Sequence, residues 1–382
     1  MCALSALLLT SPARTNWAGT SLISPAGLRD RGGFLVHFLT YVSEVSMRRS
    51  TRTRFVLTAL TAVAALALSA CSSSSASAPS DTAGNPTSGV TLRIGDQVKS
   101  TQSLLEAAGE LDGLGYGIEW STFEAGPPLL EALGANKIDA GGTGDVPPVF
   151  AQANGNSGRI VAVQARSATN DFLLVPANST ASSIADLKGK KIAVTQGSSS
   201  HGLVLGLLEQ AKLPVSDFQF QFLSPADALS AFGSGQVDAW AVWNPYATVG
   251  RNTAGAKVIA DGSEVTTGQS YFSAASDALA DPAKSAALAD FFQRLARAQV
   301  WADAHPEAWV PIFAKLTKLP QDVAAASFDT SKGSYVPIDD QRIAKQQKLI
   351  DLFAAAGLLK QAPVAGDWFD ARFNQQIQAG AK

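Results

Sequence analysis

The chain of 382 residues has little cysteine and little histidine, two residues of the first type and three of the second. Cys2 lies close to the first residue, and Cys71 follows an apolar run. If translation starts at Met47, Cys71 is the one cysteine of the protein, and no disulfide can form. His201 and His305 lie far apart in the sequence, so we expect no zinc or iron site and no cofactor.

An excess of positive charge is also lacking. The formal net charge is −2, 46% of the residues are hydrophobic and 16% are charged, which is typical of a globular protein of about two domains. No basic run occurs outside the N-terminal leader, so nucleic acid is not an expected partner. After Cys71 no apolar run approaches the ~18 residues that a membrane-spanning helix needs.

The segment from Met47 to Cys71 is typical of a secretory signal peptide. Its arginines precede an apolar run of roughly 14 residues, Phe55 to Leu68, which is too short to span a membrane. The run ends in Leu68-Ser69-Ala70-Cys71, which is similar to a bacterial lipobox, and a lipobox cysteine carries lipid. We therefore expect lipidation of Cys71 and an extracytoplasmic protein on the outer face of the cell membrane.

Short apolar strands alternate with helical patterns after residue 90, which predicts an α/β fold with parallel or mixed sheets flanked by helices. The chain also repeats itself. Residues Glu131 to Asp145 and Ser230 to Asn244 share a helix, a glycine, an Asp-Ala strand start and a following proline. Two such units predict two similar lobes, although any α/β protein contains helix-glycine-strand units.

The expected organisation follows from these patterns. We predict a mis-assigned upstream extension, a lipoprotein signal peptide, a disordered serine-rich tether, a first lobe, a second lobe, and a return to the first lobe with C-terminal helices. The corresponding ranges are 1–46, 47–70, 71–89, 90–174, 175–266 and 267–382. The chain is expected to pass between the lobes near Leu173–Pro176 and near Thr266–Tyr271.

The most informative turn has the sequence KKIAVTQGSSSHG and joins a strand to a helix. Ligands of parallel sheets bind at such turns, where the helix start offers unpaired N–H groups and partial positive charge. A glycine, three serines and a histidine would add donors, so we predict an anion site. These residues are Gly197, Ser198, Ser199, Ser200 and His201. The simpler alternative is that one serine caps the helix.

Three further turns are expected to face the same cleft. They supply Gln97, Ser100, Thr101, Thr143, Gly144, Asp145, Trp243, Asn244 and Tyr246. We expect Asp145 to cap its own helix with its carboxylate, and Lys99 to be solvated. Trp243 is as well explained by simple burial in a core as by contact with a ligand.

The four turns contain no arginine. A phosphate would require more positive charge or an acceptor for its proton, so donors alone favour a monoanion. The residues themselves leave sulfonate, nitrate and carboxylate open.

Several motifs resemble the periplasmic aliphatic sulfonate-binding proteins of ABC importers, within the nitrate, sulfonate and taurine substrate-binding family. They are IDAGGTGDVPPVFAQANG, SIADLKGKKIAVTQGSSSHG and LSPADALSAFGSGQVDAWAVWNPY. The resemblance implies a type II two-lobed binding protein that closes on its ligand, is a monomer and not an enzyme, and delivers the ligand to a permease and its ATPase. It also implies that Gln97, the Thr143–Asp145 turn and the Gly197–His201 turn line the cleft.

The chain departs from the family pattern at Asn244, where the family usually has aspartate. The missing carboxylate disfavours ligands with an amino group, such as taurine, and favours a plain alkyl or aryl sulfonate. Asp96 also replaces a residue that is usually aromatic. The expected function is therefore capture of an alkyl sulfonate for sulfur uptake, with nitrate, taurine or another small organic anion as alternatives. A Ser199/His201 nucleophile pair has no third residue to orient the histidine, so catalysis is not expected.

Overall fold

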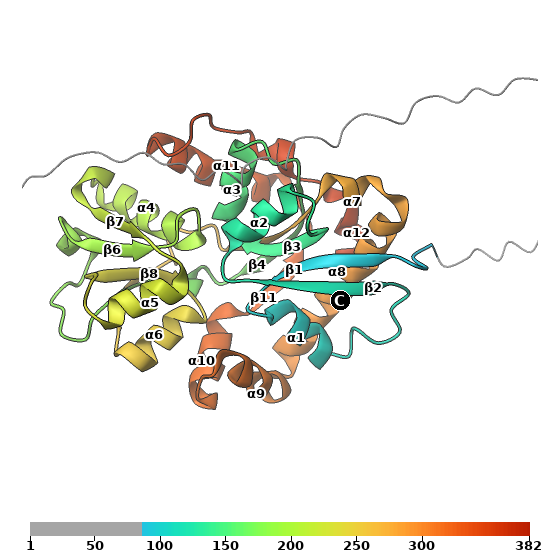
Figure 1. The fold of residues 1–382 in the computed structure, drawn as a ribbon, viewed down its shortest axis with the longest axis horizontal. Coiled ribbons are helices and arrows are strands. Elements are labelled where there is room, and N and C mark those ends of the chain that lie inside the picture. The colour runs from blue at the N-terminus through green and yellow to red at the C-terminus, as the bar shows by residue number, and fades with distance from the viewer. Residues whose placement is uncertain (1–85) are drawn as a thin grey trace, which may run out of the picture. The chain divides into compact units, whose positions relative to one another are not determined.

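The computed structural model describes residues 86–382, which belong to one compact unit (Figure 1). The predicted extension, signal peptide and lipidated Cys71 lie outside the described residues, as does most of the tether. Within residues 86–382, none of the helices has the length and apolarity that a membrane crossing requires. The described chain forms two mixed sheets flanked by helices, as the sequence predicts.

The first sheet has six strands in the order β11-β4-β10-β3-β1-β2. Three of its strands are parallel and adjacent, and the other three pair antiparallel. The parallel strands are β1 (Thr91–Gln97), β2 (Gly117–Phe123) and β3 (Ala140–Gly144); the antiparallel strands are β10 (Gln269–Ala274), β4 (Arg159–Arg166) and β11 (Gly333–Val336). The helices that follow β1, β2 and β3 are α1 (Ser100–Ala107), α2 (Gly126–Gly134) and α3 (Val146–Ala153).

The second sheet has five strands in the order β7-β6-β8-β5-β9. Its parallel strands are β6 (Lys191–Val194), β7 (Gln219–Phe222) and β8 (Ala239–Trp243), and β5 (Asp171–Val175) pairs antiparallel with both β8 and β9 (Lys257–Asp261). Helices α4 (Ser199–Ala211), α5 (Pro225–Gly233) and α6 (Tyr246–Ala254) follow the parallel strands. The two repeated sequence segments form α2–β3 and α5–β8, equivalent places in the two sheets.

The first crossing between the sheets differs from the sequence expectation. Strand β5 belongs to the second sheet, so the second lobe includes Asp171 and does not begin at residue 175. The crossing is the short 3-10 turn Ala168–Asn170, and the expected hinge at Leu173–Pro176 lies at the end of β5. The second crossing joins β9 to β10 and overlaps the expected segment near Thr266. After Asp171, the sequence of β5 is a continuous apolar run, and such a run does not indicate which of the two sheets the strand joins.

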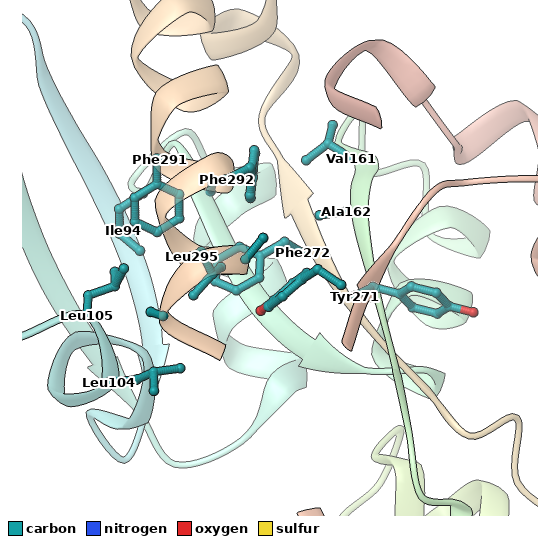
Figure 2. Packing of buried hydrophobic residues seen from close by; sticks show 14 of the residues in the cluster. Ile94, Leu104, Leu105, Val161, Ala162, Tyr271, Phe272, Phe291, Phe292 and Leu295 are labelled. Carbon is teal, nitrogen blue, oxygen red and sulfur yellow. The ribbon is translucent and has the colours of Figure 1, made fainter. Parts of the chain in front are cut away.

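The C-terminal part adds helices to the first lobe. They are α7 (Ser276–Ala280), α8 (Pro282–Ala304), α9 (Pro306–Thr317), α10 (Gln321–Ser331) and α12 (Asn374–Gly380). Helix α8 lies in the core, where Phe291 and Phe292 pack edge-on against Phe272 of β10 (Figure 2). This apolar layer packs α8 against β10, a strand of the first sheet that also contributes residues to the cavity described below.

Helix α11 (Asp340–Ala355) contacts both lobes, although the sequence suggested a return to the first lobe alone. It lies beside α3 and α4 (Figure 1). Its Phe353 belongs to an apolar cluster with Val146 of α3 and Leu205 of α4. The amphipathic pattern of α11 shows that one face is buried but not which helices cover it.

Candidate functional site

A cavity of about 220 Å³ lies between the two lobes and is lined by residues of both. It lies where the parallel strands end and their helices begin, the usual place for a ligand in such sheets. Ten of the fourteen residues predicted from the sequence line it. They are Gln97, Ser100, Thr101, Thr143, Gly144, Ser198, Ser199, Trp243, Asn244 and Tyr246.

His201 is one of the four predicted residues that do not line the cavity. Its side chain is buried, and its Nδ1 accepts a hydrogen bond from the backbone N–H of Gly197 (3.3 Å). The ring lies among four phenylalanines, Phe150, Phe220, Phe222 and Phe353. Burial lowers the pKa of His201 to about 4, so the ring is neutral at pH 7. The prediction that His201 donates to an anion is wrong. The buried ring instead accepts a hydrogen bond from the backbone of its own turn and thereby stabilises the conformation of that turn.

The three serine hydroxyls form hydrogen bonds within the protein. Ser198 is the N-cap of α4, and its Oγ accepts from the N–H of His201, which is the simpler role considered above. Ser199 and Ser200 donate their hydroxyls to Oδ1 of Asp171, at 2.6 and 2.9 Å. What the turn offers the cavity is therefore the backbone N–H end of α4 and its partial positive charge, and not a row of hydroxyls.

The starts of α3 and α4 meet at the cavity. A Cβ added to Gly144 would lie 3.0 Å from the Cβ of Ser199, so the glycine permits this close approach of the two lobes. The expectation that Asp145 caps α3 is wrong, because its carboxylate makes no capping bond. Its Oδ2 accepts instead from the hydroxyl (2.6 Å) and the N–H (3.3 Å) of Thr267, in the second crossing.

Among the polar side chains that line the cavity and that sequence reasoning missed, four lie close together at the ends of strands or at the first crossing. They are Arg166, Asn170, Ser270 and Tyr335. The Nδ2 of Asn170 and the Oγ of Ser270 are buried without a hydrogen-bond partner. Within the described part of the chain, the Arg166 guanidinium and the Tyr335 hydroxyl make no hydrogen bond or ion pair either. We call this region, with the starts of α3 and α4, the polar end of the cavity.

The fold explains how these groups converge. Ser270 of β10 and Tyr335 of β11 both lie opposite Gln164 of β4, so all three side chains share one face of the first sheet. Arg166 lies two residues after Gln164 and shares that face because strand side chains alternate. Burial lowers the pKa of Arg166, and the charges of Asp171 and Asp145 oppose this. The sequence argument that no arginine serves the site is therefore wrong: Arg166 ends an antiparallel strand, outside the four turns that were considered.

The predicted residues of the first turn hold each other in place. The Nε2 of Gln97 donates to the carbonyl of Gly142 (2.9 Å), and the Ser100 hydroxyl donates to the carbonyl of Gln97 (2.9 Å). Asp96 is buried and accepts from the N–H groups of Thr101 and Gln102, so its carboxylate stabilises the start of α1. These bonds fix the wall of the first lobe.

On the second lobe, Asn244 and Tyr246 follow β8. The Oδ1 of Asn244 accepts from the hydroxyl of Thr248 (2.7 Å), and the Tyr246 ring meets Trp243 edge-on. The Tyr246 hydroxyl donates to the carbonyl of Glu124 in the first lobe (3.3 Å). This bond joins the two walls of the cleft directly.

The remaining wall is apolar and comes mainly from α1 and the C-terminal helices. It consists of Leu104, Leu295, Ala302, Trp309, Phe313 and Phe328, and we call it the apolar end of the cavity. Figure 2 shows Leu295 beside the core phenylalanines, and Leu104 apart from them on its own helix. At its border, Gln164 donates to Gln299 (2.9 Å), which in turn donates to Asp303 (3.0 Å). Among residues 86–382 no cluster of three or more histidine, cysteine or acidic side chains could hold a metal ion.

Comparison with known proteins gives a consistent family. A family model described as ABC transporter, phosphonate, periplasmic substrate-binding protein matches residues 112–315. An Escherichia coli (strain K12) protein that carries the name aliphatic sulfonates-binding protein is 38% identical over 267 residues, which is 69% of this chain and 83% of the relative.

Solved structures agree. The alkanesulfonate-binding protein SsuA from Xanthomonas axonopodis pv. citri, bound to MOPS, superposes with a TM-score of 0.69 at 32% identity, covering 74% of this chain and 99% of that one. The periplasmic aliphatic sulphonate binding protein SsuA from Escherichia coli gives 0.66 at 35% identity, covering 74% and 92%. The chain belongs to the family of periplasmic substrate-binding proteins of ABC transporters, and its fold is the two-lobed fold of that family.

Proposed function

We propose that this protein captures a singly charged sulfonate with an apolar tail, an alkyl sulfonate, for an ABC importer. The observation that carries the proposal is the composition of one cavity. Its polar end holds Arg166, Asn170, Ser270 and Tyr335, and the wall formed by α1 and the C-terminal helices is apolar. A ligand that matches both ends must combine a small anion with a hydrocarbon tail.

The polar end favours an anion whose oxygens all accept. Arginine, an amide NH₂ and two hydroxyls can each donate to a sulfonate oxygen, and the starts of α3 and α4 add partial positive charge. The unpartnered Nδ2 of Asn170 supports this role, because a buried donor without a partner is costly unless a ligand satisfies it. The nearby carboxylates of Asp145 and Asp171 accept from Thr267 and from the serines, and neither lines the cavity.

The apolar end favours a tail over a bare ion. Each buried methylene contributes about 0.8 kcal/mol, so affinity should rise roughly threefold to fourfold per methylene until the cavity is filled. Nitrate or sulfate would leave this wall without a partner. Taurine would need an acceptor for its ammonium group. Asn244 supplies no negative charge, the carboxylate of Asp96 already accepts from the N–H groups of Thr101 and Gln102, and Glu124 is exposed to solvent. Alkyl sulfonate therefore fits better than the alternatives.

The wider role follows from the family. The lobes would close on the ligand, with Tyr246 bonding to Glu124 across the cleft, and the closed form would dock on the permease. We extend the proposal to a lipid anchor at Cys71, an extracytoplasmic location, a monomeric state and sulfur uptake. Catalysis is not part of it: Ser199 donates to Asp171 and His201 accepts from Gly197, so the two form no nucleophile-base pair.

A calorimetric panel on the purified protein tests the proposal. We expect hexanesulfonate to bind most tightly, methanesulfonate more weakly, and taurine, nitrate and sulfate weakest. The recovered ligand should be unchanged by mass spectrometry. Tighter binding of nitrate or taurine than of hexanesulfonate would refute the assignment, and a chemically altered ligand would point to an enzyme.

A further inference from the structure

The polar end of the cavity adjoins charged groups that the proposed function does not use. Two buried carboxylates accompany Arg166: Asp145, at the start of α3, and Asp171, at the start of β5. All three side chains line a second, smaller cavity of about 10 Å³. Neither carboxylate forms a salt bridge with Arg166 in the described part of the chain. The negative charges of both nevertheless raise the pKa of Arg166, against the lowering by burial.

These carboxylates are held by hydrogen bonds from within the protein and do not line the main cavity. Asp171 receives the hydroxyls of Ser199 and Ser200, and Asp145 receives the hydroxyl and N–H of Thr267. Burial raises the pKa of both carboxyls, that of Asp145 to about 6, and the hydrogen bonds from these donors oppose the rise. Because neither carboxylate lines the main cavity, neither can accept a proton from a ligand bound there.

The local charge follows from counting. At a pH where both carboxylates are ionised, Arg166 contributes +1 and Asp145 and Asp171 contribute −1 each, so the three side chains together carry a net charge of −1. Asp96 and Glu124 also line the cavity, and among residues 86–382 no second lysine or arginine does. The Coulomb energy between the ligand and these carboxylates is proportional to the charge of the ligand. A ligand with two negative charges is therefore repelled by the carboxylates about twice as strongly as a ligand with one.

We propose that Asp145 and Asp171 are specificity-determining residues, which limit the site to ligands with one negative charge and reject alkyl phosphonates of the same shape. The proposal rests on the proposed function, because it concerns the same anion site. A phosphonate with two charges meets the repulsion twice. A phosphonate with one charge keeps a P–OH group, and neither aspartate offers it an acceptor.

The test compares hexanesulfonate with hexylphosphonate, whose tails are identical. At a pH where the phosphonate carries two charges, we expect the unmodified protein to bind it about 30-fold or more weakly than the sulfonate. Asp145→Asn and Asp171→Asn preserve the acceptor oxygens for Thr267 and the serines. In each variant the ratio of the affinity for the sulfonate to the affinity for the phosphonate should fall about tenfold. Removing one negative charge from the protein reduces the repulsion of a ligand with two charges more than that of a ligand with one. Asp238→Asn, at the other end of the second sheet, is the control and should leave the ratio unchanged.

The outcomes separate the two proposals. Equal binding of both ligands by the unmodified protein, which needs no variant, overturns the charge limit while the sulfonate assignment stands. A ratio that stays constant in both folded aspartate variants, checked by circular dichroism, overturns it as well. If the unmodified protein binds neither ligand, the proposed function fails and the charge limit fails with it.

Discussion

At the polar end of the cavity, the walls come from strand ends and helix starts of both lobes, whereas at the apolar end they come from α1 and the C-terminal helices of one lobe. The polar end would recognise a charge through a few fixed donors, so one substitution should affect every ligand. The apolar end would recognise a tail through the apolar surface area that the tail buries. The effect of a substitution there on affinity should therefore depend on the length of the tail. The two ends should therefore be separable by experiment.

The largest expected effect is at the polar end. Arg166→Ala removes its cation and leaves Asp145 and Asp171 without compensation, so affinity for any sulfonate should fall about 100-fold, about 3 kcal/mol. Calorimetry with methanesulfonate and hexanesulfonate measures it, and both ligands should lose equally. Arg251→Gln, at the exposed end of α6, is the control. A loss of affinity for hexanesulfonate alone would contradict the assignment of Arg166 to the end of the cavity that binds the anionic group.

A smaller and more selective effect is expected at the apolar end. Ala302 is fully buried and lines the cavity from α8, so Ala302→Phe would fill the space that a tail needs. Octanesulfonate should lose about 30-fold in affinity, while methanesulfonate changes less than about twofold. Val300→Phe, at an exposed position of the same helix, should change neither affinity. Equal losses for both ligands would show that the tail lies elsewhere.

The smallest effect is expected where the two lobes touch. Tyr246→Phe removes the bond to the carbonyl of Glu124, a neutral hydrogen bond of about 1 kcal/mol, so affinity should fall about fivefold for every sulfonate. Stopped-flow kinetics should place the change in the dissociation rate, because the bond holds the closed form. An unchanged dissociation rate would remove Tyr246 from the closure.

The sequence predicted features that depend on local patterns. Alternating strands and helices, the repeated α2–β3 and α5–β8 units, and the glycine turn before α4 follow from propensity and periodicity, and they place ten predicted residues in the cavity. The hydroxyl partners were not predictable in this way. Ser199 and Asp171 are paired only because β5 joins the second sheet beside α4, a fact of long-range packing.

Arg166 and Tyr335 show the same limit. Each is an ordinary polar residue near a strand end, and nothing nearby in the sequence marks either as part of a site. They meet because β4 pairs with β11, more than half of the described chain later. A signal was nevertheless present: Arg166 follows a buried apolar strand and directly precedes the crossing between lobes. A charged residue at such a position is a candidate for a cleft residue.

The most direct test of the central claim is a crystal structure of the protein with hexanesulfonate. We expect the sulfonate oxygens to lie about 2.7–3.1 Å from the nitrogens of Arg166 and Asn170, with the tail directed toward Trp309 and Phe313. A sulfonate bound away from Arg166, or a ligand in the reverse orientation, would contradict the assignment of the two ends.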